Sequence, residues 1–357
     1  MNTRSMYLAA ILTTAGLCAQ DDKHAQDMPN PKTEHHAALQ QWVGTWKVKG
    51  TMDAMPGVPG MEEAVDSEGT ETASLICDGL WLKWESVMEC NGKQSTGLWL
   101  VGYDPFKKQY TSYVVSSDEH CQGLVPLTGT FDAKAKTWTW IGESPEGKMK
   151  SVCEFTGKDT LKETLFMVGP DGAEKQFMVM ERTRSKDAKP ASIANASMRQ
   201  DPDAADSKHL AVLLNDIGMW DAIVENDCSG ETTTEKATEK VHAICDGKWT
   251  WTDFQSEYMG QPFTGHALLG WDPTKNEYAS LWIDSMSATC CLTSGTYDEK
   301  TKTYSFEGSC TGPDGAPMTV EQTATCEGKD QRVLSMKFEH PQMQSTMKIT
   351  YTRRAAK

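Results

Sequence analysis

The sequence predicts an all-β protein built as two antiparallel up-and-down β-barrels in tandem, each preceded by a short helix. Val43-Gly44-Thr45-Trp46 returns as Ile217-Gly218-Met219-Trp220, and later motifs return in the same order, so one domain occurs twice. Each copy contains about ten alternating segments of roughly six to ten residues, ended by Gly, Asp, Asn or Lys-rich turns. Because no helical pattern joins these segments, the strands are expected to pair antiparallel.

Local signals support the first elements of each copy. Asp78-Gly79 suits the two positive-φ positions of a type I′ turn, which predicts a hairpin of residues 70–77 and 80–89. The second copy repeats this turn as Asp246-Gly247. One apolar face with helical spacing predicts the helix before the second barrel: Leu210, Leu213, Leu214 and Ile217.

The predicted divisions are a signal peptide over residues 1–19, a flexible tail over 20–33, the first barrel over 34–184, a linker over 185–205 and the second barrel over 206–357. The linker holds Ser, Ala, Asn, Pro and Asp without an apolar period. We therefore expect the two barrels to move independently.

The N-terminus predicts export to a secreted or periplasmic location. A basic residue, Arg4, precedes an apolar run at residues 6–12 and a small-residue cleavage site at Ala19. The apolar run is too short to span a bilayer, so no transmembrane span is expected. A lipid anchor on Cys18 is the alternative, but Leu17 stands where a lipobox needs a small residue.

Charge and motifs exclude several functions. The formal net charge of -15 makes nucleic acid and anionic membranes poor partners. The chain has no G-x-G-x-x-G, P-loop or H-E-x-x-H motif, and no cofactor is expected. Ser285 beside Asp284 cannot form a catalytic pair alone, because neighbours in a strand face opposite ways. The histidines are scattered, so we predict no catalytic residue and treat haem binding at His340 as a minor alternative.

Cysteine usage predicts disulfides. Without Cys18, ten of the eleven cysteines remain in a chain directed to an oxidising compartment. If Tyr297 pairs with Thr303, Cys290 lies opposite Cys310, with Cys291 as the alternative partner should the register slip by one. Zinc is the rival, but no C-x-x-C pair occurs, so no metal site is expected. The topology suggests three further bridges: Cys77 with Cys153, Cys245 with Cys326, and Cys90 with Cys121.

A Gly-x-Trp behind a short helix, with an Arg near the end of the last strand, resembles the pattern of lipocalins and related calycin barrels. The resemblance implies that the Arg lies across the Trp and closes one end of a lipocalin-like barrel, a structural role. We take Arg182 and Arg353 as the first candidates. The pairs to consider are Trp46 with Arg182 or Arg184, and Trp220 with Arg353 or Arg354.

A set of motifs occurs in order along the chain: Gly44-Thr45-Trp46, the Asp-Gly hairpin, Gly-Tyr/Trp-Asp-Pro, Trp282-Ile283-Asp284-Ser285-Met286, Gly-Thr-Tyr/Phe-Asp, Gly169-Pro170-Asp171-Gly172 and Met180-Glu181-Arg182. Over almost all of both copies, this set more closely resembles the bacterial family known as domain of unknown function 1579. The resemblance implies a secreted or cytosolic barrel and assigns no chemistry. Two differences separate the copies: the first has Val114 and Ser116 where the second has Trp282 and Asp284, and the second has Met219 where the first has Thr45.

The functional hypothesis is an exported protein that binds small hydrophobic molecules, because a barrel of this size encloses room for one small apolar ligand. A Met- and Pro-rich loop at residues 52–61 could cover the mouth of the first barrel. The alternatives are a structural or interaction protein of the cell envelope with solid barrels, and an unrecognised hydrolase. Nine tryptophans offer aromatic lining, although we expect most of them to be ordinary core residues: Trp81, Trp84, Trp99, Trp138, Trp140, Trp249, Trp251, Trp271 and Trp282.

The predicted ligand site lies in the second copy. Trp282, Asp284 and Met286 alternate along one strand, which would place an aromatic wall, an acceptor and a pliable apolar side chain on one face. The first copy has Val114, Ser116 and Asp118 at these positions. We therefore expect a weaker site, or none, in the first barrel.

Overall fold

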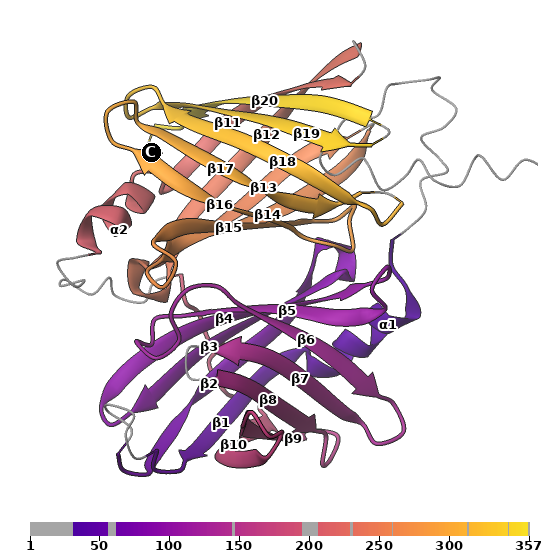
Figure 1. Cartoon of the computed structure of the whole chain (residues 1–357), viewed down its shortest axis with the longest axis vertical. Helices are drawn as coiled ribbons and strands as arrows, with labels where there is room; N and C mark the ends of the chain where they lie inside the picture. Colours follow the sequence, from indigo (N-terminus) through magenta and orange to yellow (C-terminus); the bar gives the residue numbers. More distant parts are fainter. Residues whose placement is uncertain are drawn as a thin grey trace, which may run out of the picture.

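The chain forms two closed β-barrels, one above the other in the computed structural model of Figure 1. The structure describes residues 31–55, 62–144, 147–194, 206–228, 231–258, 260–312, 314–341 and 343–355. The predicted signal peptide and most of the apolar loop at 52–61 lie outside these ranges. Within them, no helix has both the length and the apolar character needed to cross a membrane.

In the first barrel, sequential strands are neighbours and the last strand returns to pair with the first, β1 with β10. Its elements are α1 (Glu34–Ala38), η2 (Leu39–Trp42), β1 (Gly44–Met52), β2 (Val65–Ile76), η3 (Cys77–Gly79), β3 (Trp81–Cys90), β4 (Lys93–Asp104), β5 (Gln109–Ser116), β6 (Val125–Asp132), β7 (Thr137–Ser144), β8 (Gly147–Glu154), β9 (Thr160–Val168) and β10 (Glu174–Arg184).

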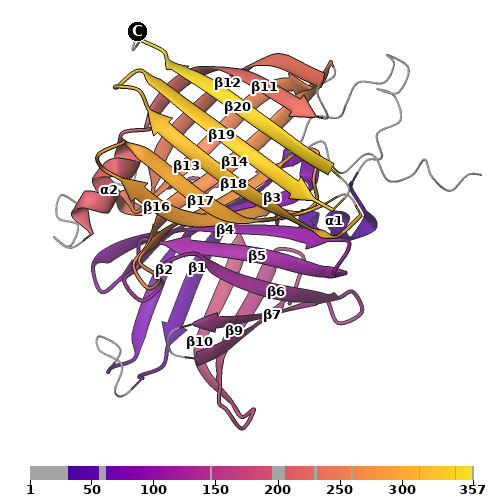
Figure 2. The same ribbon diagram turned by 45° about the horizontal axis from the view of Figure 1, so that its top comes forward.

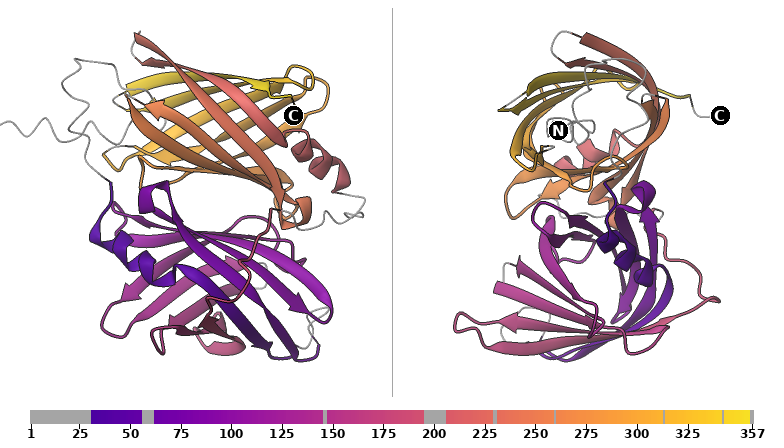
Figure 3. Two further views of the ribbon diagram at one scale, coloured as in Figure 1. Left: turned by 180° about the vertical axis from the view of Figure 1, so that it is seen from behind. Right: turned by 90° about the vertical axis from the view of Figure 1, so that its right-hand side faces the viewer.

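The second barrel repeats this topology and closes through β11 and β20, with α2 at one end (Figure 3). The predicted fold class is therefore confirmed. Its elements are α2 (Ser207–Leu214), β11 (Gly218–Cys228), β12 (Glu231–Ile244), η4 (Cys245–Gly247), β13 (Trp249–Tyr258), β14 (Gln261–Asp272), β15 (Glu277–Asp284), β16 (Cys291–Asp298), β17 (Thr303–Thr311), β18 (Pro317–Cys326), β19 (Gln331–His340) and β20 (Met343–Arg353).

The Asp-Gly turns are longer than predicted. Cys77, Asp78 and Gly79 all have positive φ, and the strands resume at the pair Ile76 and Trp81. Cys77 therefore belongs to the turn rather than to the strand. The same turn recurs in the second copy at η4, again with positive φ at Cys245, Asp246 and Gly247.

An Arg over a Trp closes the helix end of each barrel. The Arg184 guanidinium lies 4.0 Å from the centre of the Trp46 ring and donates to the Gln41 carbonyl at 2.7 Å. Arg353 lies 4.1 Å from the Trp220 ring and donates to the Ile217 carbonyl at 2.5 Å. The guanidinium therefore binds carbonyls at the end of the helical segment while it stacks on the indole.

The Gly of Gly-x-Trp makes room for this Arg. Gly218 has a φ of 145°, and a Cβ built there would lie 2.6 Å from the Arg353 guanidinium. A side chain at this position would be strained by its backbone and would displace the Arg. The motif therefore encodes the closure of the barrel.

The prediction that Arg182 lies across the Trp46 ring is wrong, because Arg184 takes this place. Arg182 lies two residues before Arg184, so its side chain shares the inward face but sits deeper in the barrel. There it contacts Glu71 and lies 5.6 Å from the Trp84 ring.

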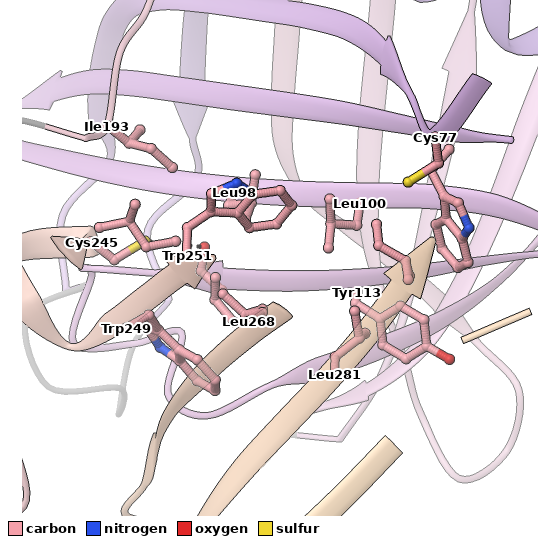
Figure 4. Close-up of a cluster of buried hydrophobic side chains, with 14 of the residues drawn as sticks. Cys77, Leu98, Leu100, Tyr113, Ile193, Cys245, Trp249, Trp251, Leu268 and Leu281 are labelled. Carbon is pink, nitrogen blue, oxygen red and sulfur yellow. Dashed lines mark hydrogen bonds between the residues drawn. The ribbon is translucent and has the colours of Figure 1, made fainter. Parts of the chain in front are cut away.

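The two barrels share one buried core formed by the outer faces of equivalent strands, β3–β5 and β13–β15 (Figures 2 and 4). The Lys248 ammonium donates to the Ser117 carbonyl at 2.8 Å, and the Cys290 thiol donates to the Tyr113 hydroxyl at 2.9 Å. Together these contacts hold the barrels against one another. The core side chains include Trp81, Leu98, Leu100, Tyr113 and Val115 from the first barrel and Trp249, Trp251, Leu268, Leu281 and Ile283 from the second.

The predicted linker contributes to this core, contrary to expectation. Ala191 and Ile193 are buried, and Ile193 belongs to the shared core (Figure 4). The Ala191 amide also donates to the Thr72 hydroxyl at 2.8 Å. The expectation of independently moving barrels is therefore wrong, because motion would expose this apolar surface.

The disulfide joins Cys291 to Cys310, not Cys290 to Cys310. Tyr297 pairs with Tyr304 rather than with Thr303, so the register differs by one residue from the assumed one. This register brings the alternative partner opposite Cys310. The Cys290 thiol instead faces the first barrel through Tyr113.

The three other predicted disulfides are absent, because their cysteines are thiols in the structure. Cys77 and Cys245 lie in the core between the barrels, whereas Cys153 lies inside the first barrel, so Cys77 cannot reach it. Cys326 and Cys90 are likewise thiols, which leaves Cys245 with Cys326, and Cys90 with Cys121, unbridged. Burial raises the pKa of the Cys77 and Cys245 thiols, so they stay protonated and unreactive.

The first prediction concerns the disulfide. Peptide mapping of unreduced protein should recover Cys291 linked to Cys310, with Cys290 as an alkylatable thiol after unfolding. Recovery of Cys290 linked to Cys310 would show that the register of β16 and β17 is wrong.

The second prediction concerns the shared core. Calorimetry of the full chain should give one unfolding transition, because neither barrel can leave the other without exposing this core. Leu281→Ala should destabilise the protein by about 2–4 kcal/mol. The control Ile223→Ala removes an aliphatic side chain that is 39% exposed and should change stability by less than about 0.5 kcal/mol. Two separate transitions in the native protein would contradict the shared core.

Candidate functional site

Indole rings fill the interior of the first barrel around its helix end. Trp84 on β3 pairs directly with Trp99 on β4, and their ring centres are 5.5 Å apart. On β7, Trp140 packs edge-on against Trp99 and stacks on Trp138. Trp42 on η2 covers this group and contacts Trp138 edge-on. Except for the partly buried Trp99, these side chains are at most 2% exposed.

The second barrel carries smaller side chains at the equivalent positions. Thr252 pairs with Ala267 where Trp84 pairs with Trp99, because β13 and β14 keep the register of β3 and β4. The pair Trp138 and Trp140 is replaced in the repeat by Tyr304 and Phe306, and Asp216 takes the place of Trp42. Asp216 and Trp42 are equivalent because their backbone carbonyls accept the same hydrogen bond. The Trp46 indole donates to the Trp42 carbonyl, and the Trp220 indole donates to the Asp216 carbonyl.

These replacements leave a cavity of about 220 Å³ inside the second barrel. An apolar cavity of roughly 150 Å³ is large enough to hold benzene. Drug-sized sites occupy roughly 300–1,000 Å³. The volume therefore suits a molecule of one ring with a short chain. Its apolar wall includes Val224, Val241, Phe254, Phe263, Trp282, Leu334, Met336, Phe338, Met347 and Ile349.

A buried ion-pair cluster forms the helix end of this cavity. The Arg332 guanidinium on β19 binds the Glu239 carboxylate and lies 3.3 Å from a carboxylate oxygen of Asp216. It also lies 4.1 Å from the centre of the Tyr351 ring. Arg332, Glu239 and Asp216 are each at most 9% exposed, and all three line the cavity.

The first barrel holds a related cluster with its cation on a different strand. Arg182 on β10 binds Glu71 at 2.6 Å and Glu163 at 2.8 Å. Glu71 and Glu239 are equivalent, because each pairs with the Trp of Gly-x-Trp. Arg182 and Arg332 are not equivalent: Arg182 lies opposite Leu161 on β9, whereas Arg332 on β19 lies opposite Tyr351. The guanidinium has therefore moved to the neighbouring strand while it keeps the same Glu partner.

Two buried polar groups of the cavity wall lack a hydrogen-bond partner within the described part of the chain. The Tyr304 hydroxyl lies toward the helix end, and the Asn226 carbonyl oxygen lies toward the opposite end of β11. Tyr304 is 3% exposed and Asn226 is 4% exposed. Buried polar groups are normally paired, so each is a place where a ligand's polar group could bind.

Trp282 lines the cavity, as the ligand-site hypothesis requires, and its ring lies 5.8 Å from that of Phe254. The neighbouring strand makes room for it, since a Cβ at Gly265 would lie 2.3 Å from the indole. Trp282 is therefore held flat against β14 and forms part of the cavity wall.

Asp284 and Met286 do not complete a stripe with Trp282. β15 ends at Asp284, so Met286 lies in the following loop and strand alternation no longer applies to it. Neither residue is among those that line the cavity. Asp284 is 1% exposed and accepts hydrogen bonds from the Trp282 indole at 2.9 Å and from the Met286 amide at 2.8 Å. Asp284 is thus not part of the cavity lining, and it holds the Trp282 indole in place through the indole N–H.

Burial raises the pKa of Asp284 to about 7, although hydrogen bonds from Met286, Trp282 and Ser287 favour its charged form. This carboxylate is the one predicted site residue whose ionisation falls near neutral pH.

Four of the tryptophans considered as cavity lining lie elsewhere in the fold. Trp81, Trp249 and Trp251 face the core between the barrels, and Trp271 packs beside α2 in a cluster with Leu213. The ion-pair cluster was not predicted from the sequence. The one available signal was the recurrence of an acidic residue at the same repeat position, since Glu71 and Glu239 both lie opposite the tryptophan of Gly-x-Trp.

The histidines that the structure describes form no metal cluster. Across the described ranges, no three His, Cys, Asp or Glu side chains are grouped so that they could hold a metal ion. His340 contacts Asp314 at 3.1 Å, and His266 contacts Asp253 at 3.1 Å.

Comparison with known proteins yields a family match and weak structural similarities. A family model described as "Protein of unknown function (DUF1579)" matches residues 30–184 and 205–353. No curated protein matches the chain. The S-type phycobiliprotein lyase CPES from Guillardia theta is similar over 41% of this chain and 93% of its own, at 8% identity and a TM-score of 0.33. A DUF3598 protein from Nostoc punctiforme PCC 73102 is similar over 90% of this chain and 100% of its own, at 8% identity and a TM-score of 0.24.

The third prediction concerns the pH dependence of stability through Asp284. Its pKa is about 7 in the folded chain, against an ordinary value of 3.8. Well below about pH 4 both states are protonated, so Asp284 imposes no penalty. As pH rises to about 7, the unfolded state gains stability by ionising first, and the native protein should lose on the order of 4 kcal/mol.

Asp284→Asn should remove this loss, so its free energy of unfolding should fall less between about pH 4 and about pH 8 than that of the native protein. Urea titrations across this range measure the difference. Asp298→Asn is the control, because Asp298 accepts the Lys300 amide in the same kind of turn but lies exposed. It separates loss of the turn from loss of the buried charge. Parallel profiles for Asp284→Asn and the native protein would show that Asp284 is not held in this state.

Proposed function

This chain belongs to the DUF1579 family, with one member domain in each barrel, and we propose that the second barrel binds one small apolar molecule. The observation that carries the proposal is the exchange of Trp84 and Trp99 for Thr252 and Ala267 within one shared register. The space beside β13 and β14 that the two indoles would fill is thereby left open, and apolar side chains line it on several sides. Apolar cavities with a few polar groups are typical small-molecule sites.

The first barrel has a structural part in this proposal. Its interior is packed with indoles around η2, and its outer face covers β13–β15 of the second barrel. β15 carries Trp282 toward the cavity and Leu281 toward the first barrel. The first barrel therefore buttresses the wall that carries Trp282. Half of the molecule thus serves a structural role, while the other half holds the ligand.

We also propose that the protein acts after export, in the periplasm or outside the cell. The support is the N-terminal pattern of Arg4 and the apolar run at 6–12, together with the Cys291–Cys310 disulfide. Disulfides persist in oxidising compartments. Cell fractionation with an antibody against the native chain tests this part separately.

The fourth prediction tests the binding proposal in the full chain. Butylbenzene should bind the native protein and change the emission of Trp282. Ala267→Trp places an indole where the first barrel has Trp99 and should weaken binding at least about tenfold, because it fills the space that the ligand occupies. Isothermal titration calorimetry measures the affinity.

Thr352→Trp is the matched control, since it adds the same indole at an exposed position on β20 and should leave affinity unchanged. Undiminished binding in Ala267→Trp would place the ligand outside this cavity. Absence of binding by the native protein would remove the proposal altogether.

A further inference from the structure

We propose that the molecule bound in the second barrel carries a cationic nitrogen, such as a protonated alkylamine, rather than a carboxylate; this inference rests on the proposed function. The cavity is acidic as well as apolar. Its helix end holds two carboxylates, Asp216 and Glu239, and one guanidinium, Arg332. A buried site with this balance attracts a cation and repels an anion.

Arg332 is not available to an acidic ligand. Its guanidinium is already bound to Glu239 and lies 3.3 Å from Asp216, and it stacks on the rings of Trp220 and Tyr351 at 4.9 and 4.1 Å. A carboxylate ligand would have to compete with two carboxylates for one cation. A cationic ligand meets the surplus negative charge instead.

The Tyr304 hydroxyl supplies an acceptor at the same end of the cavity. Its oxygen has no hydrogen-bond partner within the described ranges, although the side chain is 3% exposed. Burial raises the pKa of this hydroxyl, and the charge of Asp216 adds to the effect. An ammonium group placed here can donate to Tyr304 and interact with Asp216 at once. The ring of Phe306, whose centre lies 5.6 Å from that of Tyr304, offers a face for cation–π contact.

Size narrows the class further. About 220 Å³ accommodates one aromatic ring with a short chain. The ring fits the apolar wall of Phe254, Trp282 and Met336, which leaves the nitrogen for the helix end. The inferred class is therefore a small aryl-alkyl amine or an amine of similar shape.

Three probes of equal length test the inference: 4-phenylbutylamine, 4-phenylbutan-1-ol and 4-phenylbutyrate. At about pH 7 the amine is cationic and the acid anionic, because alkylamines titrate near 10 and carboxylic acids near 4. Isothermal titration of the full chain should give the tightest binding for the amine and at least a tenfold weaker affinity for the acid, with the alcohol between them.

Two variants locate the preference. Asp216→Asn should reduce the ratio of amine to acid affinity at least threefold. Tyr304→Phe removes an oxygen that bonds to nothing in the described structure, so the fold should persist while amine affinity falls severalfold. Glu163→Gln in the first barrel is the matched control, because it removes a carboxylate from the Arg182 cluster, and should leave the ratio unchanged.

The outcomes separate the two proposals. Equal binding of all three probes, or tightest binding of the acid, would overturn the cationic preference and leave the ligand cavity standing. Failure of all three probes and of butylbenzene to bind would defeat the proposed function and this inference together. An amine preference that persists in both Asp216→Asn and Tyr304→Phe would contradict the placement of the nitrogen at the helix end of the cavity.

Discussion

A closed barrel fixes the volume of its interior, so the side chains that point inward decide whether that volume is solid or hollow. Both barrels here have ten strands in the same order and nearly the same registers. The inner positions differ, with Trp84 facing Trp99 in one copy and Thr252 facing Ala267 in the other. Because protein interiors are normally close-packed, the loss of several indoles within one barrel leaves space, which Trp282 opposite Ala267 fills only in part.

The buried ion pairs show how the two copies diverged. Each barrel keeps one guanidinium beside a Glu that faces the Gly-x-Trp tryptophan, yet Arg182 and Arg332 occupy different strands. A buried pair is weak evidence for stability, but the loss of one partner leaves an uncompensated charge. The cation was therefore retained while its position changed. In the second barrel it lies at the wall of a cavity, where the same charges acquire a role in choosing a ligand.

The internal repeat predicted the fold because alternation and turn residues are local properties, and both copies carry them. The same alternation brings Trp282 to the cavity wall. Asp284 and Met286 do not follow it there, because the strand ends at Asp284 and alternation says nothing beyond it. The disulfide depended on a register that one residue in the turn changes, so Cys291 took the place of Cys290.

Two features had no local signal. The shared core puts Leu281 and its neighbours against the other barrel, and alternation cannot tell an outer face that meets solvent from one that meets a partner. Arg332, the cation beside the cavity, stands where the first copy has Leu161. A comparison of the two copies therefore could not identify it. Both features arise from tertiary contacts.

The difference between a hollow second barrel and a solid first one can be seen in a crystal structure determined under xenon pressure, since xenon enters dry apolar cavities. We expect a xenon atom between Phe254, Trp282 and Met336, and none between Trp84 and Trp99. A second barrel without xenon, or xenon at the Trp84 and Trp99 pair of the first, would show that the two interiors do not differ in this way.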